Sequence, residues 1–477
     1  MDSTNNNNYK DRWLILFIVV MVTFMATLDS SIVNVALPVM AKALNVTSAG
    51  IQVVVTSYLI VISATILIFG SLGDILGKTK IFKFGIALFT LGSLLCGITS
   101  SLPILVLARV IQSVGAAGAM ANSQGIITQV FQSNGRGKAL GIVGTFVALG
   151  ALVGPPLGGF IVDAAKWEYI FLINVPIGVI TLFYSFKVLP KSHKTAKIHF
   201  DGLGAVLFMI TIITLFAALG YAQEVGFTKP IILLGFLIAI ISFVAFIMVE
   251  KKCEKPLLQL SIFENKLFSL SIFCGFISFV AMFCSTIIQP FYLQDVMKFS
   301  PSLTGLILTV FPIVLGVVAP FSGHFSDKIG SEILTLIGLV LTSSGLLLMS
   351  TLNENSPIIT MVFFTATMSL GTGLFQAPNT SLIMSTVPKD KLGIAGSINA
   401  LVRNIGMICG IVLSTTLLYN RMSYKLGYHV TNYVVGRNDA FIYGMKTVYI
   451  TAAAICFIGA GLTALRLFKS KNRLTNA

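Results

Sequence analysis

Long apolar runs recur along the whole chain, and they limit its possible folds more than any other feature. Fourteen such runs lie near residues 13–40, 51–70, 81–99, 103–128, 138–162, 169–189, 202–221, 230–249, 267–293, 303–325, 333–351, 358–380, 393–419 and 443–465. Each can cross a bilayer as a helix, because about 20 apolar residues span the hydrocarbon core. With 56% hydrophobic and 10% charged residues, the chain has more apolar sequence than a soluble core can bury. The sequence therefore predicts an all-α membrane protein with fourteen transmembrane helices.

The basic residues lie mostly on one side of these predicted spans. If the N-terminus is cytoplasmic, the inside segments hold 22 of the 32 Lys and Arg residues and the outside segments hold eight. This asymmetry follows the positive-inside rule, and an even number of spans returns the C-terminus to the cytoplasm. We therefore expect a multi-pass protein of the cell (plasma) membrane with both termini cytoplasmic. The formal charge of +15 then reflects topology and implies no nucleic-acid partner.

One acidic residue, Asp29, lies inside the first apolar run. A carboxylate within a bilayer is costly unless it is neutralised, paired or hydrated, so Asp29 is a candidate functional residue. On a helical wheel it points away from a polar side made up of Thr23, Thr27, Ser30, Ser31, Asn34 and Pro38. The pattern predicts a central helix with its polar side toward a cavity and Asp29 toward a neighbouring helix. A static structural ion pair is the alternative.

Arg109 in the fourth run lies in the same half of the membrane as Asp29. An Arg side chain is long enough to bridge the remaining difference in depth, so we hypothesise that the two residues form one network. The guanidinium favours the carboxylate, and burial favours the neutral acid. These opposed effects suit a group that binds and releases a proton, so Asp29 and Arg109 are the candidates for proton coupling.

A second intramembrane arginine, Arg403, lies near the middle of the thirteenth run. No acidic residue lies deep in any span of the second half, so Arg403 is predicted to face a substrate cavity. Hydrogen bonding to backbone carbonyls in a packed interface is an equal alternative. Polar side chains on predicted helix stripes complete the candidate cavity residues, which are Asn34, Gln112, Ser285, Gln289, Tyr292, Asn379, Asn399 and Arg403.

An internal repeat indicates two halves. Residues 70–80 read GSLGDILGKTK, and residues 323–330 read GHFSDKIG, a weaker copy that comes eight spans later. The offset predicts two six-helix bundles, residues 1–190 and 253–477, joined by residues 191–252 with two inserted helices. Parallel repeats with a substrate site between them are a common plan of transporters. We expect a tight turn over residues 70–80 and a conformational latch between the halves, with Gly70, Asp74, Gly77, Lys78 and Asp327 as its candidate residues.

The fifth run carries a second glycine pattern. Gly150, Gly154 and Gly158 recur at four-residue spacing, which places small surfaces on one helix face and allows a close approach of another backbone. Pro155 and Pro156 remove two helix donors, so we expect a bend there. We expect this segment to contribute to the outer seal between the halves, with ordinary packing as the alternative.

These motifs resemble those of the major facilitator superfamily. The loop signature of that family is matched by Gly70, Leu72, Asp74, Gly77, Lys78 and Lys80, and its antiporter motif by Gly150, Gly154, Pro155, Gly158 and Gly159. Residues 27–38, 167–178, 290–296 and 377–379 are similar to segments of its fourteen-span drug/proton antiporter branch, of the multidrug and quaternary-ammonium efflux type. Two positions depart from the pattern, because Ile75 replaces a basic residue and Ser113 replaces a glycine. The resemblance implies two six-helix bundles plus two inserted helices, and proton-coupled efflux.

The sequence therefore favours a proton-coupled antiporter that exports amphipathic or hydrophobic small molecules by alternating access. One alternative is a transporter of a single physiological metabolite, such as an organic anion attracted by Arg403. The other is a non-transporting membrane receptor or enzyme, which the absence of H-E-x-x-H and G-x-S-x-G motifs disfavours. We expect no enzymatic activity, no cofactor and no metal. The expected partners are an amphipathic substrate, protons and the lipid bilayer, with the protein monomeric.

Overall fold

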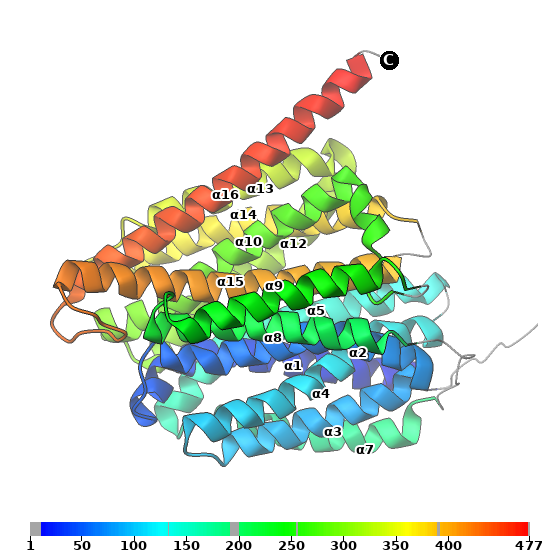
Figure 1. Ribbon diagram of the computed structural model, residues 1–477, viewed down its shortest axis with the longest axis horizontal. Helices are drawn as coiled ribbons and strands as arrows, with labels where there is room; N and C mark the ends of the chain where they lie inside the picture. Colours follow the sequence, from blue (N-terminus) through cyan, green and yellow to red (C-terminus); the bar gives the residue numbers. More distant parts are fainter. Residues whose placement is uncertain (1–10, 132, 191–199, 254–255, 389–391, 476–477) are drawn as a thin grey trace, which may run out of the picture.

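Long helices that share one common direction, horizontal in Figure 1, make up most of the molecule. The computed structural model describes residues 11–131, 133–190, 200–253, 256–388 and 392–475. Among these residues, fourteen helical segments are long and apolar enough to cross a membrane, and no strand occurs. The predicted fold class and number of spans are therefore confirmed. Helices are the expected outcome, because a bilayer offers no water to satisfy backbone donors and acceptors.

The elements follow the predicted runs closely. They are α1 (Arg12–Ala43), η1 (Gly50–Gln52), α2 (Val53–Leu76), α3 (Lys78–Gly97), α4 (Leu102–Val130), α5 (Ser133–Ala164), α6 (Tyr169–Leu172), α7 (Asn174–Val188), α8 (Gly202–Val225), α9 (Pro230–Glu250), η2 (Leu260–Glu264), α10 (Lys266–Phe291), η3 (Tyr292–Val296), α11 (Pro301–Leu308), α12 (Val310–Ile329), α13 (Ser331–Met349), α14 (Ile358–Ser385), α15 (Leu392–Leu426) and α16 (Asn438–Thr475). Four spans combine two elements: η1 with α2, α6 with α7, α10 with η3, and α11 with α12.

The packing of the helices repeats along the chain. In the first half α3 packs on α4 and α1 on α5, and in the second half α13 packs on α14 and α10 on α15. The helices α8 and α9 pack on each other, and α8 also touches α2 and α15. Figure 1 shows this pair in green between α15 and α2. The helix order thus fits two bundles with an inserted pair, while the exact domain boundaries stay a prediction.

The repeated glycine motifs form one-residue links between helices. Gly77, with φ 100°, joins α2 to α3, and Gly330, with φ 92°, joins α12 to α13. Glycine suits both positions because side chains with a Cβ rarely adopt positive φ. The expectation of a turn over residues 70–80 is wrong in extent. The segment before Gly77 continues α2 as a regular helix, because its backbone bonds are satisfied within that helix.

The two halves touch on one side of the molecule. We call the side where α1 begins and α16 ends the terminal side, which lies on the right in Figure 1, and the opposite side the distal side. On the distal side Lys42 Nζ donates to Asp295 Oδ1 at 2.8 Å, and Gln294 Nε2 donates to the Val35 carbonyl at 2.8 Å. Both contacts join α1 to η3, so they hold the two halves together on the distal side.

The terminal side has a different arrangement. A Cβ added at Gly141 or Gly144 of α5, or at Gly316 or Gly323 of α12, would meet no atom within 4 Å. These small positions therefore face open space. At these four positions of α5 and α12 no other element packs within 4 Å, whereas contacts between the halves close the distal side.

The glycine face of α5 packs on α1 within the first half. A Cβ at Gly154 would lie 1.8 Å from Ser31 Oγ, and one at Gly158 would lie 2.7 Å from Ile32 Cγ1. Ser31 Oγ also donates to the Gly150 carbonyl at 3.0 Å. The close approach predicted for this face is present, but its partner is α1. Gly154 does not lie at the seal between the halves, which corrects the expectation for that residue.

Contact between the halves comes from the adjacent face of α5. A Cβ at Gly159 would lie 2.2 Å from the Pro301 carbonyl oxygen, and one at Gly305 of α11 would lie 2.2 Å from the Pro155 carbonyl oxygen. Beside them, Ser302 Oγ donates to Asp163 Oδ2 at 2.6 Å. The distal seal therefore depends on backbone contact between α5 and α11, which only glycine permits at these two positions.

Candidate functional site

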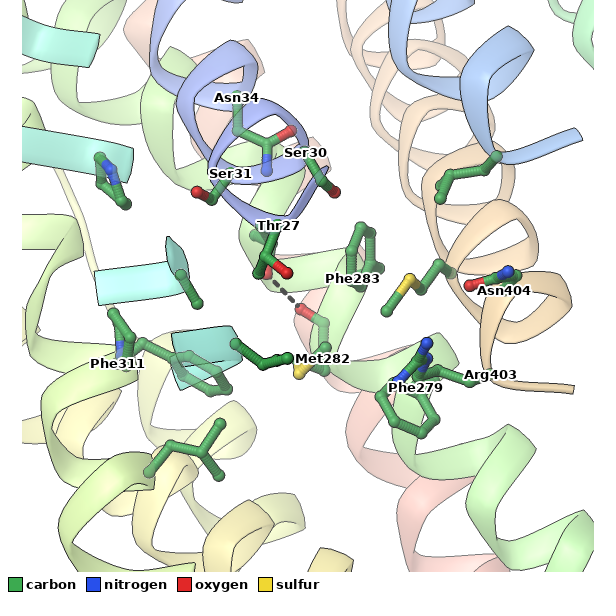
Figure 2. Close-up of a pocket in the computed structure, with 18 of the residues that line it drawn as sticks. Thr27, Ser30, Ser31, Asn34, Phe279, Met282, Phe283, Phe311, Arg403 and Asn404 are labelled. Atoms are coloured by element: carbon green, nitrogen blue, oxygen red, sulfur yellow. Dashed lines mark hydrogen bonds between the residues drawn. The ribbon is translucent and has the colours of Figure 1, made fainter. Parts of the chain in front are cut away.

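A cavity of about 340 Å³ lies between the two halves. Helices of the first half contribute one wall, and α10, α11, α12, α14 and α15 contribute the other. Its apolar lining includes Met120, Met282, Met368, Met407, Phe279, Phe283 and Phe311. Several of these side chains point into the same space in Figure 2. A volume of this size suits a small organic molecule, and methionine and phenylalanine walls adapt to different shapes.

One side of α1 supplies the polar part of the cavity. Thr23, Thr27, Ser30, Ser31 and Asn34 all line it, as the helical wheel predicts. Figure 2 labels Thr27, Ser30, Ser31 and Asn34 on this helix. The Asn34 Oδ1 atom is buried and has no hydrogen-bond partner among the described residues. The hydroxyls of Thr23 and Thr27 bond to carbonyls of their own helix at 2.9 Å. The amide of Asn34 thus has spare hydrogen-bonding capacity on this face.

Arg403 of α15 lines the cavity from the opposite half. The thirteenth span therefore turns this side chain toward the cavity, as predicted, and away from a packed interface. Its Nε atom is buried without a hydrogen-bond partner in the described part of the chain. None of the ion pairs found among the described residues includes it. The guanidinium is the one ionised side chain among the residues described as lining this cavity.

Asp29 lies on the other side of α1, away from the cavity. It is 0% exposed, and its partner Arg109 is 1% exposed. Arg109 NH1 donates to Asp29 Oδ2 at 2.6 Å, and Gln112 Nε2 donates to Oδ1 at 2.8 Å. Asn174 Nδ2 of α7 adds a third bond to Oδ1 at 3.1 Å. The structure thus brings the two residues together as hypothesised, and it surrounds the carboxylate with N–H donors only.

The same network continues around Arg109. Its Nε donates to the Val54 carbonyl at 3.1 Å, and its NH1 also donates to Gln112 Oε1 at 2.6 Å. Gln112 Nε2 in turn donates to Ser93 Oγ at 2.9 Å. The network therefore joins α1, α2, α3, α4 and α7, so a change in the charge of Asp29 acts on five helices of the first half.

Tyr58 of α2 separates this network from the cavity. The Arg109 Cζ atom lies 4.2 Å from the centre of the Tyr58 ring, and Tyr58 also lines the cavity. Its hydroxyl is buried without a hydrogen-bond partner among the described residues. A cation over an aromatic face is held by the ring quadrupole. The ring is therefore a wall with the cavity on one side and the guanidinium on the other.

Five predicted cavity residues do not line the cavity, for identifiable reasons. Gln112 belongs to the Asp29 network. Ser285 accepts a hydrogen bond from Gln289 at 2.7 Å and contacts Met349 of α13, and the Tyr292 hydroxyl donates to the Asn353 carbonyl at 2.6 Å. Asn379 ties α14 to α10 through the Ser271 carbonyl at 3.0 Å. Asn399 is half-buried outside the lining, whereas Gln289 does line the cavity.

Lys78, a candidate latch residue, pairs within the first half. The Lys78 ammonium pairs with the Asp74 carboxylate one turn away, and its stem packs on Gly125 of α4. Gly70 lies within α2 and Gly77 forms the link to α3. Asp327 belongs to α12, and its side chain lies outside the described residues. In this conformation Lys78 does not reach the second half.

Sequence reasoning missed several residues that the structure places at the site. Tyr58, Asn174 and Ser93 join the Asp29 network or its wall, and Lys42 and Asp295 form the ion pair on the distal side. The signal for Asn174 was its position as a lone amide within an apolar run. The pairing of Lys42 with Asp295, 253 residues apart, has no local signal, because only the assembled halves bring them together.

Known proteins are similar to this chain in sequence and in fold. Residues 19–254 and 271–476 match the sequence profile of the Major Facilitator Superfamily. The chain is 33% identical over 469 residues to the riboflavin transporter RibZ of Clostridioides difficile (strain 630), covering 98% of this chain and 100% of that protein. It is 30% identical over 408 residues to the multidrug resistance protein Stp of Mycobacterium tuberculosis (strain ATCC 25618 / H37Rv), covering 85% and 76%. It is 28% identical over 449 residues to multidrug resistance protein 3 of Bacillus subtilis (strain 168), covering 94% and 85%.

Solved structures with the same fold have low sequence identity. A POT family transporter in complex with 5-aminolevulinic acid superposes with a TM-score of 0.69 at 14% identity, covering 94% of this chain and 96% of that one. A bacterial homologue of the human lysosomal transporter Spinster, in an inward-facing and occupied conformation, has a TM-score of 0.66 at 13% identity, covering 97% of both chains. These likenesses show the fold.

Proposed function

The chain belongs to the Major Facilitator Superfamily of transporters, and from this premise we propose that it is a proton-coupled antiporter that exports amphipathic small molecules. The observation that carries the proposal is the buried pair of Asp29 and Arg109 directly behind one wall of the central cavity. A titratable acid next to a substrate site is the arrangement that proton coupling requires. The multidrug resistance proteins among the relatives support export of more than one compound.

The conformation of the molecule fits one of the two main states of an alternating-access cycle. The positive-inside rule favours cytoplasmic termini, and we infer a state that is open to the cytoplasm on the terminal side. In this state the substrate enters the cavity from inside while the distal seal stays closed. In the opposite state the seal opens, and Asp74 and Lys78 contact the second half. Each half supplies one cavity wall, so a monomer is sufficient.

Proton binding at Asp29 drives the change between the two states. The three N–H donors around the carboxylate suit its ionised form, because a protonated acid would place a fourth hydrogen among donors. Protonation removes the charge that holds Arg109 beside α1. The contact between α1 and α4 then loosens, and the Tyr58 wall between Arg109 and the cavity changes shape. Substrate and proton thereby act on the same wall in opposite senses.

Everted membrane vesicles with an imposed pH gradient test this function. Uptake of an amphipathic fluorescent compound into the vesicles should follow the gradient and should stop when the gradient is dissipated. Asp29→Asn keeps the shape of the side chain and cannot titrate, so it should abolish gradient-driven uptake in protein that is inserted normally. Glu264→Gln is the matched control, because that carboxylate is exposed and belongs neither to the network nor to the distal seal. Full gradient-driven uptake by Asp29→Asn would contradict the assignment of Asp29 as the proton-coupling residue.

A second candidate function is the transport of one physiological metabolite. Two observations favour it: the Arg403 guanidinium, which has no ion-pair partner among the described residues, and the 33% identity with a riboflavin transporter. A planar, ring-containing metabolite would fit between the aromatic side chains of the cavity. Riboflavin itself is the first compound to test in the same vesicles. Saturable transport of riboflavin without any transport of unrelated amphiphiles would favour this candidate over multidrug export.

A further inference from the structure

The charge of the cavity is set by a single residue. Arg403 is the one ionised group among the described lining residues, and the remaining polar lining is made of hydroxyl, amide and phenol groups. No carboxylate of the described residues lies within ion-pair distance of it. Its Nε atom also lacks a hydrogen-bond acceptor. The guanidinium therefore gives the cavity a positive charge that no described residue of the protein compensates.

Such an arrangement is costly within a membrane. A buried cation is usually paired with an acid or held by backbone carbonyls, and an unpaired one is expensive. The first half shows the usual solution, because Arg109 binds Asp29, Gln112 and the Val54 carbonyl. The same chain thus pairs one intramembrane arginine with an acid and leaves the other open to the cavity. An oxyanion supplied by the ligand is the group that would complete the second one, since a guanidinium pairs with two oxygens at once.

The surroundings of Arg403 restrict the rest of the ligand. Gly406, one turn further along α15, packs against the Cβ of Phe279 on α10, and a Cβ added there would lie 3.0 Å from it. Figure 2 shows Phe279 beside Arg403, with Phe283 and Met282 on the same helix and Phe311 across the cavity. The polar side of α1, including the unpartnered Asn34 Oδ1, lies in the other half. A ligand that fills this space has an anionic group, an aromatic body and a polar edge.

We propose that the cavity selects aromatic amphiphiles with a single oxyanion, and that Arg403 is the residue that recognises this charge. The inference rests on the proposed function, because it names the substrate class of the same cavity. It also excludes a class of compounds. A cationic amphiphile would bring a second positive charge into a cavity that has no described carboxylate to neutralise it. Cations should therefore bind worst, and neutral analogues should lie in between.

Binding of three matched probes to the purified full-length protein tests this proposal without any proton gradient. The probes are 1-naphthaleneacetate, 1-naphthaleneacetamide and 2-(1-naphthyl)ethylammonium, which share a ring and differ in charge. Titration calorimetry in detergent at constant pH gives each Kd. The wild-type protein should bind the acetate about tenfold or more tightly than the ammonium compound, as expected for one charge-assisted contact.

Substitutions of Arg403 separate charge recognition from folding. Arg403→Gln should weaken binding of the acetate about tenfold or more and leave binding of the acetamide within about twofold, which also shows that the variant is folded. Arg403→Lys should retain part of the preference, because an ammonium keeps the charge and loses the two-pronged geometry. Arg421→Gln removes the same charge from an exposed position further along α15 and should behave like the wild type.

Two results would overturn the proposal. The first is tighter binding of the ammonium compound than of the acetate by the wild type. The second is unchanged binding of the acetate by Arg403→Gln, which would mean that Arg403 finds its partner within the protein in another conformation. Either result leaves the vesicle test of proton coupling untouched. Conversely, charge-selective binding without any gradient-driven transport would overturn the proposed function and leave this inference standing.

Discussion

Asp29 shows how much depends on the partners of one side chain. Its carboxylate receives bonds from Arg109 and Gln112 of α4 and from Asn174 of α7, and all of these groups are fully buried. Breaking a buried ion pair by removing one partner costs about 3–5 kcal/mol, because the remaining charge stays uncompensated. The loss of stability is smaller when both charged side chains are replaced together, because no unpaired charge remains buried. This asymmetry separates a structural role from a coupling role.

Arg109→Gln should destabilise the protein by about 3 kcal/mol or more, because it leaves the Asp29 carboxylate without its cation. The double variant Asp29→Asn with Arg109→Gln should recover much of that stability and should transport no better than Asp29→Asn alone. Thermal unfolding in detergent and vesicle transport measure the two effects. If the losses in transport add up, the two residues act separately and the proposed network is not the coupling unit.

Tyr58 provides a finer test of the wall between the network and the cavity. Tyr58→Phe keeps the ring on Arg109 and removes a hydroxyl without a described partner, so stability and transport should stay within about twofold of the wild type. Tyr58→Leu removes the ring and a cation–π contact of about 1–2 kcal/mol, so proton-driven transport should fall while ligand binding persists. Loss of transport in Tyr58→Phe would instead assign a direct role to the hydroxyl.

At the scale of the element, two faces of α5 make different contacts, one with α1 and one with the second half. Gly154 and Gly158 fit against α1 inside the first half, and Gly159 fits against Pro301 of the second half. The first contact persists when the halves move as units, whereas the second exists only while the distal side is closed. A bulky side chain therefore has a different consequence on each face, although the positions are neighbours in the sequence.

Gly159→Leu should shift the protein toward the state with an open distal side, because its side chain cannot fit beside the Pro301 carbonyl. Spin labels at Lys166 and Lys298, both exposed on the distal side, would report a longer distance by pulsed electron paramagnetic resonance. Gly461→Leu is the control, since a Cβ there meets no atom within 4 Å. An unchanged distance distribution in Gly159→Leu would show that the seal does not depend on this contact.

At the scale of the whole molecule, the distribution of charge sets the energy of transport. The two intramembrane arginines lie in different halves, and the acid that pairs with one of them lies outside the cavity. If one proton enters for each monoanion that leaves, two elementary charges move in the favourable direction. A neutral substrate exchanged for one proton moves one charge, and a monocation moves none.

Membrane potential should therefore drive export of a monoanion twice as strongly as export of a neutral analogue. Each charge is worth about 2.3 kcal/mol per 100 mV, so the two cases differ by about 2.3 kcal/mol at that potential. Vesicles in which the pH gradient and the potential are set independently measure the difference, with the acetate and acetamide probes as a matched pair. Equal dependence on potential for both probes would mean that the anion leaves together with a second proton, so that no extra charge moves.

Local pattern was sufficient for the features that depend on a single helix or on depth in the membrane. The apolar runs determined the fourteen spans, and the wheel of the first run determined which side of α1 lines the cavity. Depth alone suggested that Asp29 and Arg109 could meet. The cost of an unpaired charge in a bilayer makes such pairings predictable, because few alternatives exist.

Only the tertiary structure decided which polar stripe faces the cavity and which faces another helix. In the span of α10 and η3 the sequence favoured Ser285, Gln289 and Tyr292. Gln289 lines the cavity, whereas Ser285 and Tyr292 bond toward the end of α13. Polar side chains occur on both kinds of face in a membrane bundle, because helices hydrogen-bond to one another as well as to water or ligand. The rotation of each helix about its axis, and hence the chemistry of the cavity, is set by the surrounding helices.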